Sequence, residues 1–239
     1  MDSLSGKIVF NLERLEERIQ AACLRSLRKR TEIALMGVTK FHSLEVVEAA
    51  YKAGLRLFGE NRVQEAREKY SEFWGKHDRK NSGAELHLIG SLQRNKAKAA
   101  AAFFDCIQSV DRESLIGELG ALTGDRENPL MVLLEYHTGE ESKAGFPDLE
   151  GLLRAAEMVL SFPGLKPAGL MTMAPFTDDK KVIRTSFRKL TAARDELEKR
   201  FPGYWSCLSM GMTGDFEIAI EEGSTLLRIG TAIFGERIT

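Results

Sequence analysis

The chain has 239 residues, of which 43% are hydrophobic and 29% are charged. These proportions are those of an ordinary globular protein with a buried core, and the length suits one large domain. The 34 lysine and arginine residues nearly balance the 35 aspartate and glutamate residues, so a net charge of −1 gives no global attraction to nucleic acid or to an anionic membrane.

The cysteines and the longest uncharged stretch indicate the compartment. Cys23, Cys106 and Cys207 are odd in number and lack CxxC spacing, which predicts buried thiols in a reducing environment. The first twenty residues carry acidic side chains and no signal-peptide core. The longest charge-free run, residues 201–214, contains proline and glycine and falls short of the ~20 apolar residues of a membrane span. We therefore expect a cytoplasmic protein.

The first predicted elements are a helix, a strand and a second helix. Apolar residues recur at helical spacing over residues 7–30, with charges between them. Residues 33–38 are almost wholly apolar, as in a strand that is buried on both faces, and this run ends at Thr39 and Lys40. Ser43 and Gly54 then suit the two ends of a helix.

This alternation of short apolar runs and amphipathic segments continues to the end of the chain. The further predicted strands are 57–59, 86–89, 106–110, 130–136, 167–171, 207–210 and 226–229, and the further predicted helices are 61–72, 94–103, 112–123, 148–161, 178–200 and 215–222. Eight βα repeats in a chain of this length favour a single (β/α)8 TIM barrel over residues 1–239, with an extra N-terminal helix. A doubly wound open sheet is the alternative.

Polar residues gather where the predicted strands end. The set contains Lys40, Glu60, Asn61, Gly90, Ser91, Gln93, Ser109, Asp111, His137, Thr172, Ser209, Arg228, Gly230 and Thr231. In a (β/α)8 barrel the functional site lies at the C-terminal ends of the strands. Lysine, arginine, asparagine, serine and glycine at such a rim indicate a site for an anionic ligand that carries a phosphate.

Lys40 is the first candidate for chemistry. It follows an apolar strand, where loss of hydration disfavours the charged amine and leaves more of the neutral nucleophile. A neutral amine forms a Schiff base with an aldehyde or a ketone. A lysine that merely ends a strand and reaches water fits the same pattern.

The C-terminal part of the chain offers a phosphate site. Gly230 and Thr231 follow the eighth predicted strand and lead into a short helical turn, which is where such barrels usually bind phosphate. Ser209 begins a glycine-rich turn that extends to Asp215 after the seventh predicted strand. This turn could supply a hydroxyl and amides to the same phosphate, or it could simply cap the next helix.

Arg228 and the histidines complete the candidates. Arg228 lies two residues before Gly230, so both point to the same side of the strand. An arginine that faces a pyridine nitrogen makes the ring a weaker electron sink than an aspartate does. His87, within an apolar run, indicates a core histidine with its hydrogen bonds satisfied, and no histidine has a metal-ligand partner at recognisable spacing.

Together these segments resemble the pyridoxal phosphate homeostasis protein family. The matching stretches are VTK at 38–40, FGEN at 58–61 with VQE at 63–65, LHLIGSLQ at 86–93 with NK at 95–96, SVD at 109–111, GLMT at 169–172, LSMGM at 208–212, EGST at 222–225 and RIGTAIFG at 228–235. They follow the family's order over nearly the whole chain. Thr39, Arg62 and the Thr213–Gly214 pair depart from its commonest residues.

The resemblance implies a barrel like the alanine racemase N-terminal domain, with pyridoxal 5′-phosphate (PLP) as cofactor. It implies that Lys40 forms the Schiff base, that Arg228 faces the pyridine nitrogen and that Asn61 lines the ring. Ser209, Gly230 and Thr231 would hold the phosphate. The racemases carry a second β domain, for which this chain has no further stretch.

The sequence is compatible with three functions. The first is a PLP carrier that maintains cofactor homeostasis without robust catalysis, that acts as a monomer and that supplies apo-PLP enzymes. The second is a PLP-dependent amino-acid racemase, for which the sequence offers no clear acid–base partner to Lys40. The third is an aldolase-like barrel, in which Lys40 attacks a sugar phosphate.

Overall fold

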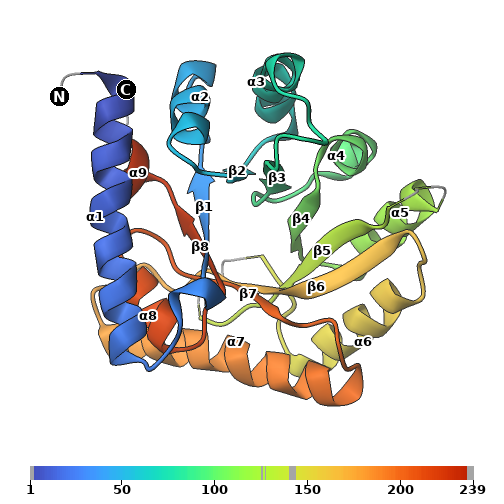
Figure 1. Cartoon of the computed structure of the whole chain (residues 1–239). Coiled ribbons are helices and arrows are strands. Elements are labelled where there is room, and N and C mark those ends of the chain that lie inside the picture. Colours follow the sequence, from blue (N-terminus) through green and yellow to red (C-terminus); the bar gives the residue numbers. More distant parts are fainter. Residues whose placement is uncertain (1–2, 125, 127, 140–143, 236–239) are drawn as a thin grey trace.

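The chain forms a closed barrel of eight parallel strands in the order β1 to β8 (Figure 1). The structure is a computed structural model that describes residues 3–124, 126, 128–139 and 144–235. The strands are β1 (Ala34–Val38), β2 (Leu57–Glu60), β3 (Glu85–Leu88), β4 (Cys106–Val110), β5 (Leu130–Glu135), β6 (Leu165–Met171), β7 (Cys207–Ser209) and β8 (Leu226–Ile229). All eight predicted strands are therefore confirmed.

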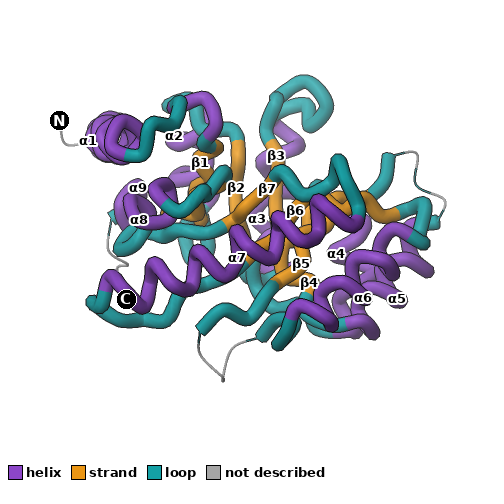
Figure 2. Tube along the Cα trace, turned by 90° about the horizontal axis from the view of Figure 1, so that it is seen from below, coloured by secondary structure: helices purple, strands orange, loops and turns teal. Residues whose placement is uncertain are grey.

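Helices cover the outside of the barrel (Figures 1 and 2). In the described residues they are α1 (Leu4–Arg25), α2 (Leu44–Lys52), α3 (Val63–Lys76), α4 (Ala97–Phe103), α5 (Glu113–Thr123), α6 (Leu149–Leu160), α7 (Lys180–Arg200), α8 (Phe216–Glu221) and α9 (Thr231–Phe234), with 3₁₀ turns at Arg30–Glu32 and Arg94–Lys96. The extra N-terminal helix α1 packs against α2, α8 and α9.

Pairing of the first and last strands closes the sheet. β8 runs parallel to β1, with Ala34 opposite Leu226 and Gly37 opposite Ile229. A doubly wound sheet is open, with two edge strands that pair on one side only, whereas here the strands pair in consecutive order and β8 also pairs with β1. The observed pairing therefore excludes that alternative.

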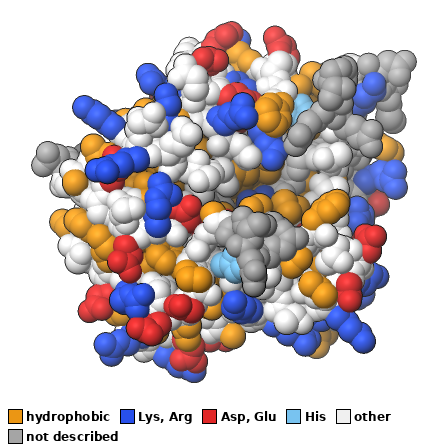
Figure 3. All heavy atoms as spheres, turned by 180° about the vertical axis from the view of Figure 1, so that it is seen from behind, with side chains coloured by type: hydrophobic (Ala, Val, Ile, Leu, Met, Phe, Trp, Pro, Cys, Tyr) orange, Lys and Arg blue, Asp and Glu red, His pale blue; other side chains and the backbone are white. Residues whose placement is uncertain are grey.

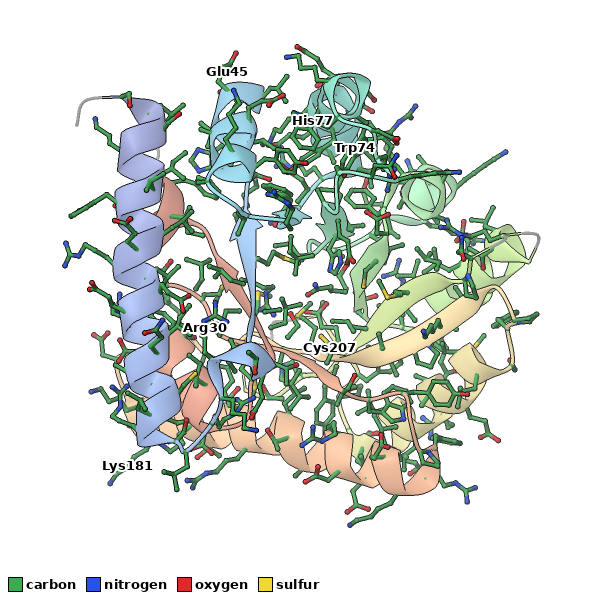
Figure 4. The ribbon with its side chains drawn as sticks, viewed as in Figure 1. Arg30, Glu45, Trp74, His77, Lys181 and Cys207 are labelled. Atoms are coloured by element: carbon green, nitrogen blue, oxygen red, sulfur yellow. The ribbon has the colours of Figure 1, made fainter. Side chains whose placement is uncertain are left out.

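The strands place alternate residues in two separate cores. On β5, Leu130, Val132 and Leu134 belong to the large apolar core that includes the helices, whereas Leu133 belongs to a smaller cluster with Cys106 and Met171. Because side chains alternate along a strand, the smaller cluster fills the barrel interior. Cys207 on β7 lies against it (Figure 4).

The opening helix is shorter than the apolar pattern predicts. It ends at Arg25 rather than at residue 30, because the N–H of Arg28 turns back to the carbonyl of Cys23 and Leu27 adopts a φ of 56°. Leu27 is 96% exposed, so its place in the apolar pattern does not correspond to burial.

The helices and the charge on one face of the surface give no sign of a membrane span or of a nucleic-acid site in the part of the chain that the structure describes. Among the described residues no helix is both long enough and apolar enough to cross a membrane. On the face shown in Figure 3, basic and acidic side chains are interspersed. That face therefore lacks the one-sided positive charge typical of a nucleic-acid site.

Alanine substitutions at two glycines should change the stability of the protein in opposite directions. Gly169 on β6 has a φ of 154°, and a Cβ added there would lie 1.8 Å from the carbonyl oxygen of Cys207, whereas a Cβ on Gly75 in α3 would meet nothing within 4 Å. We expect Gly169→Ala to lower the free energy of unfolding by roughly 2–3 kcal/mol and Gly75→Ala to raise it by about 0.5–1 kcal/mol. Urea denaturation measures both, and shifts of equal sign would contradict the prediction.

Candidate functional site

A cavity of about 660 Å³ opens at the C-terminal ends of the strands. Its wall includes Lys40 after β1, Asn61 after β2, Gly90 after β3, Glu135 at the end of β5 and Arg228 on β8. The volume lies within the range of about 300–1,000 Å³ that small-molecule sites occupy. The cavity therefore lies at the end of the barrel where the sequence predicts the functional site.

The structure brings five of the six predicted cofactor residues to this cavity. They are Lys40, Asn61, Arg228, Gly230 and Thr231. Ser209 is not among the lining residues: it is fully buried, and its hydroxyl donates to Oε1 of Gln108 over 2.6 Å. Thr213, four residues further along, lines the cavity instead. The predicted hydroxyl of Ser209 thus lies at the buried end of this loop, whereas Thr213 lies at the end that lines the cavity.

Lys40 reaches the cavity because of its position relative to β1. Met36 and Val38 alternate with Gly37, and Val38 itself lines the cavity. Residue 40 continues the side of the strand to which Val38 belongs, whereas Thr39 faces the helix layer and bonds to Tyr70 of α3. The pleat of the strand thus directs the amine toward the ligand space.

Arg228 is held in place by neighbouring strands. Its Nη1 donates to the carbonyl and the hydroxyl oxygens of Ser209, both at 2.7 Å, and its Nη2 donates to the carbonyl of Thr172 at 2.8 Å. The residue is 4% exposed, and burial lowers the pKa of its guanidinium. A buried cation is tolerated only where acceptors surround it, and these three oxygens fix its direction.

A chain of hydrogen bonds continues from Arg228 through the barrel interior. Ser209 bonds to Gln108, the amide of Gln108 lies 2.8 Å from Nδ1 of His87, and Nε2 of His87 lies 3.2 Å from Glu85. Both ring nitrogens of His87 therefore have partners, which confirms the prediction of a satisfied core histidine. The chain links the arginine in the cavity to the opposite end of the barrel.

Two loops meet where the sequence predicts a phosphate. Gly230 precedes α9, and the residues 212–214 line the cavity beside it. Thr213 Oγ1 accepts a hydrogen bond from the N–H of Ala232 over 3.3 Å, which ties the two loops together. Gly211 permits this turn, since its φ is 98° and a Cβ there would lie 2.6 Å from that of Ala219. The arrangement presents backbone amides and hydroxyls of the kind that bind anions.

Close packing of two loop backbones fixes Asn61. A Cβ on Gly90 would lie 2.3 Å from the carbonyl oxygen of Asn61 and 2.8 Å from its Cα. Only glycine lets the end of β3 approach the end of β2 so closely. Gly90 thus positions Asn61 on the cavity wall.

Glu135 is a site residue that the sequence reasoning did not assign. It lines the cavity and is 4% exposed. Burial raises the pKa of its carboxyl to about 7, the Asp111 carboxylate adds to the rise, and Arg228 opposes it. The alternation of side chains along β5 could have identified it, because Glu135 lies two residues after the interior-facing Leu133 and therefore faces the same way.

Comparisons with known proteins agree with this geometry. Residues 11–238 match the family model described as "Alanine racemase, N-terminal domain". The fold and the position of the cavity thus define a barrel of the alanine racemase type.

Individual proteins that resemble this chain over nearly its whole length identify its family within the alanine racemase type of barrel. The pyridoxal phosphate homeostasis protein of Aquifex aeolicus is 40% identical over 95% of this chain and 96% of its own. A solved structure of an unknown protein from Bifidobacterium adolescentis has a TM-score of 0.90 and 35% identity over 98% of this chain and 97% of that one. PipY from Synechococcus elongatus, solved with PLP bound, has a TM-score of 0.79 and 33% identity over 92% of this chain and 99% of its own. The chain belongs to the pyridoxal phosphate homeostasis protein family.

The raised pKa of Glu135 predicts a pH-dependent stability in the ligand-free protein. Its folded-state pKa of about 7 lies above the ordinary value of 4.5, so the folded state favours the protonated acid. The destabilisation is absent below pH 4.5, grows between pH 4.5 and 7, and reaches on the order of 3 kcal/mol above pH 7. We expect Glu135→Gln to unfold at higher urea concentration than the wild type at pH 8.

The matched control is Glu150→Gln on α6, whose side chain is 85% exposed. We expect this variant to change stability little at either pH. A Glu135→Gln advantage of equal size at pH 5 and pH 8 would contradict the assigned ionisation.

Proposed function

We propose that this protein binds PLP in the cavity, holds it as a Schiff base on Lys40 and serves PLP homeostasis in the cell without robust catalysis of its own. The observation that carries the proposal is the convergence of Lys40, Arg228 and the Gly230–Thr231 turn on one cavity of about 660 Å³. The names of the relatives and the PLP-bound structure of PipY support it.

The residues present fit the chemical groups of PLP. Lys40 offers an amine for the aldehyde, and the two tied loops around Thr213 and Gly230 offer amides and hydroxyls for the phosphate. Asn61 lies on the same wall for the ring. In this assignment Ser209 acts indirectly, by holding Arg228, and Thr213 provides the hydroxyl on the cavity side.

Arg228 favours holding the cofactor over using it. Bound PLP supplies an aldehyde for amines and a ring that withdraws electrons. An arginine that donates to the pyridine nitrogen leaves that nitrogen unprotonated and weakens the withdrawal. The hydrogen bonds of Arg228 to Ser209 and Thr172 hold the guanidinium in one direction in the cavity wall, which supports this role.

We also propose a monomer in the cytoplasm that passes PLP to apo-enzymes. The described lining of the cavity brings together Lys40, Arg228 and the Gly230–Thr231 turn within a single chain, which supports binding by the monomer. Cys23, Cys106 and Cys207 are free thiols, as expected in a reducing compartment.

Glu135 favours a second candidate, a PLP-dependent amino-acid racemase. Such an enzyme needs a proton-exchanging group besides Lys40, and a cavity carboxyl with a pKa of about 7 is able to gain and lose a proton near neutral pH.

Lys40→Ala tests the Schiff base. We expect purified wild-type protein to show a violet-blue absorption band that borohydride abolishes, and the variant to lack it, because Lys40 is the lysine that the described wall of the cavity contains. Lys52→Ala, an exposed lysine of α2, is the control and should keep the band. A colourless wild type that does not take up added PLP would refute the proposal and favour a sugar-phosphate ligand.

Incubation with pure enantiomers separates the two candidates. We expect PLP-loaded protein to leave L-alanine, D-alanine and L-serine unconverted on chiral chromatography, since Arg228 weakens the electron sink. Interconversion at ordinary enzyme rates of about 1 s⁻¹ or more would establish the racemase instead. In that case Glu135→Gln should abolish the conversion.

A further inference from the structure

The residue after Lys40 has an unfavourable backbone conformation. Phe41 has a φ of 65°, one of two such non-glycine residues in the described chain. A bulky residue in the left-handed region is strained by about 1–3 kcal/mol and persists only where its surroundings enforce it. The turn that presents Lys40 therefore needs an external restraint.

Glu65 and Lys69 provide that restraint from α3. The backbone N–H of Phe41 donates to Oε1 of Glu65. Lys69 Nζ donates to the same carboxylate at 3.3 Å and to the carbonyl oxygen of Thr39 at 2.7 Å. The residues on both sides of Lys40 are thus bonded to one pair of helical side chains.

Glu60 completes the cluster beneath the turn. Its Oε1 accepts from Lys69 Nζ at 2.8 Å and from the hydroxyl of Thr39 at 2.7 Å. Its side chain is fully buried, and that of Lys69 is 7% exposed. Within the described chain Glu60 Oε2 has no hydrogen-bond partner.

Stability of the barrel alone does not account for this arrangement. A buried ion pair is often no better for stability than apolar residues of the same volume, because both charges lose hydration. Here the charged groups converge on the backbone and side-chain oxygens of residue 39 and on the amide of residue 41. They restrain the turn around one lysine.

We propose that Glu60, Glu65 and Lys69 form a positioning brace that holds the Thr39–Phe41 turn and so aims the amine of Lys40 into the cavity. The inference rests on the proposed PLP-binding function and names residues that act without touching the cofactor. The brace lies on the helix side of β1 and Lys40 on the cavity side, because successive residues alternate. Loss of the brace lets Phe41 relax and the lysine turn away.

Three variants of α3 test the brace. Glu65→Ala removes the acceptor of the Phe41 N–H, Glu65→Gln retains an acceptor oxygen, and Glu68→Ala removes an exposed carboxylate of the same helix as the control. Each protein is stripped of cofactor and mixed with PLP, and the growth of the Schiff-base absorption band is followed. In parallel, affinity is measured for pyridoxamine 5′-phosphate, whose amine cannot form that bond with Lys40.

We expect Glu65→Ala to form the Schiff base about tenfold more slowly, with pyridoxamine phosphate affinity unchanged. Glu65→Gln should recover most of the rate, and Glu68→Ala should match the wild type. A Glu65→Ala rate equal to that of Glu68→Ala would overturn the brace, as would a parallel loss of pyridoxamine phosphate affinity, which indicates a general structural role. A wild type that binds pyridoxamine phosphate but forms no band with PLP would overturn the Schiff-base function, and the brace with it.

Discussion

Alternation of side chains along the strands of a closed barrel is the constraint on which this site depends. One face of each strand looks into the barrel, the other looks at the helices, and a shift of one residue would exchange them. On β1 this rule separates Lys40 from Thr39, and on β8 it separates Arg228 from the apolar Leu227 and Ile229. On β8 the cavity thus receives a polar group without interrupting the apolar layer behind it, whereas behind Lys40 that layer contains the ion pair of Glu60 and Lys69.

Polar residues on the inner face are costly unless they are bonded to one another. Arg228 meets this requirement through Ser209, which is bonded in turn to Gln108, and Gln108 contacts His87. Such a chain makes each member depend on the next, so residues deeper in the barrel help to fix the direction of the guanidinium. A rigid arginine suits a site whose proposed task is to hold a ring nitrogen in one state.

The sequence predicted the repeating architecture well, because parallel strands that are buried on both faces leave continuous apolar runs. It predicted less where tertiary contacts decide. Lys69 lies in a helix rich in charges, where its sequence context predicts a solvated side chain. Only the packing of α3 against β2 buries it beside Glu60. Ser209 and Thr213 both carry a hydroxyl, and the sequence does not show which of them reaches the cavity. In the structure Ser209 is the last residue of β7, and Thr213, in the loop that follows, lines the cavity.

Holding and releasing a cofactor places a demand on the site that catalysis does not. The lysine amine must form its bond readily, yet the cofactor must remain able to leave. A site of this kind therefore benefits from a fixed lysine and an open cavity rather than from additional contacts between protein and cofactor. The proposed brace meets the first need from behind, where it touches no ligand. Glu135 lines the same cavity from the end of β5, where burial raises the pKa of its carboxyl to about 7. In the closed order of strands β5 lies across the barrel from β1, so this carboxyl and the turn that carries Lys40 face the cavity from different sides of the barrel.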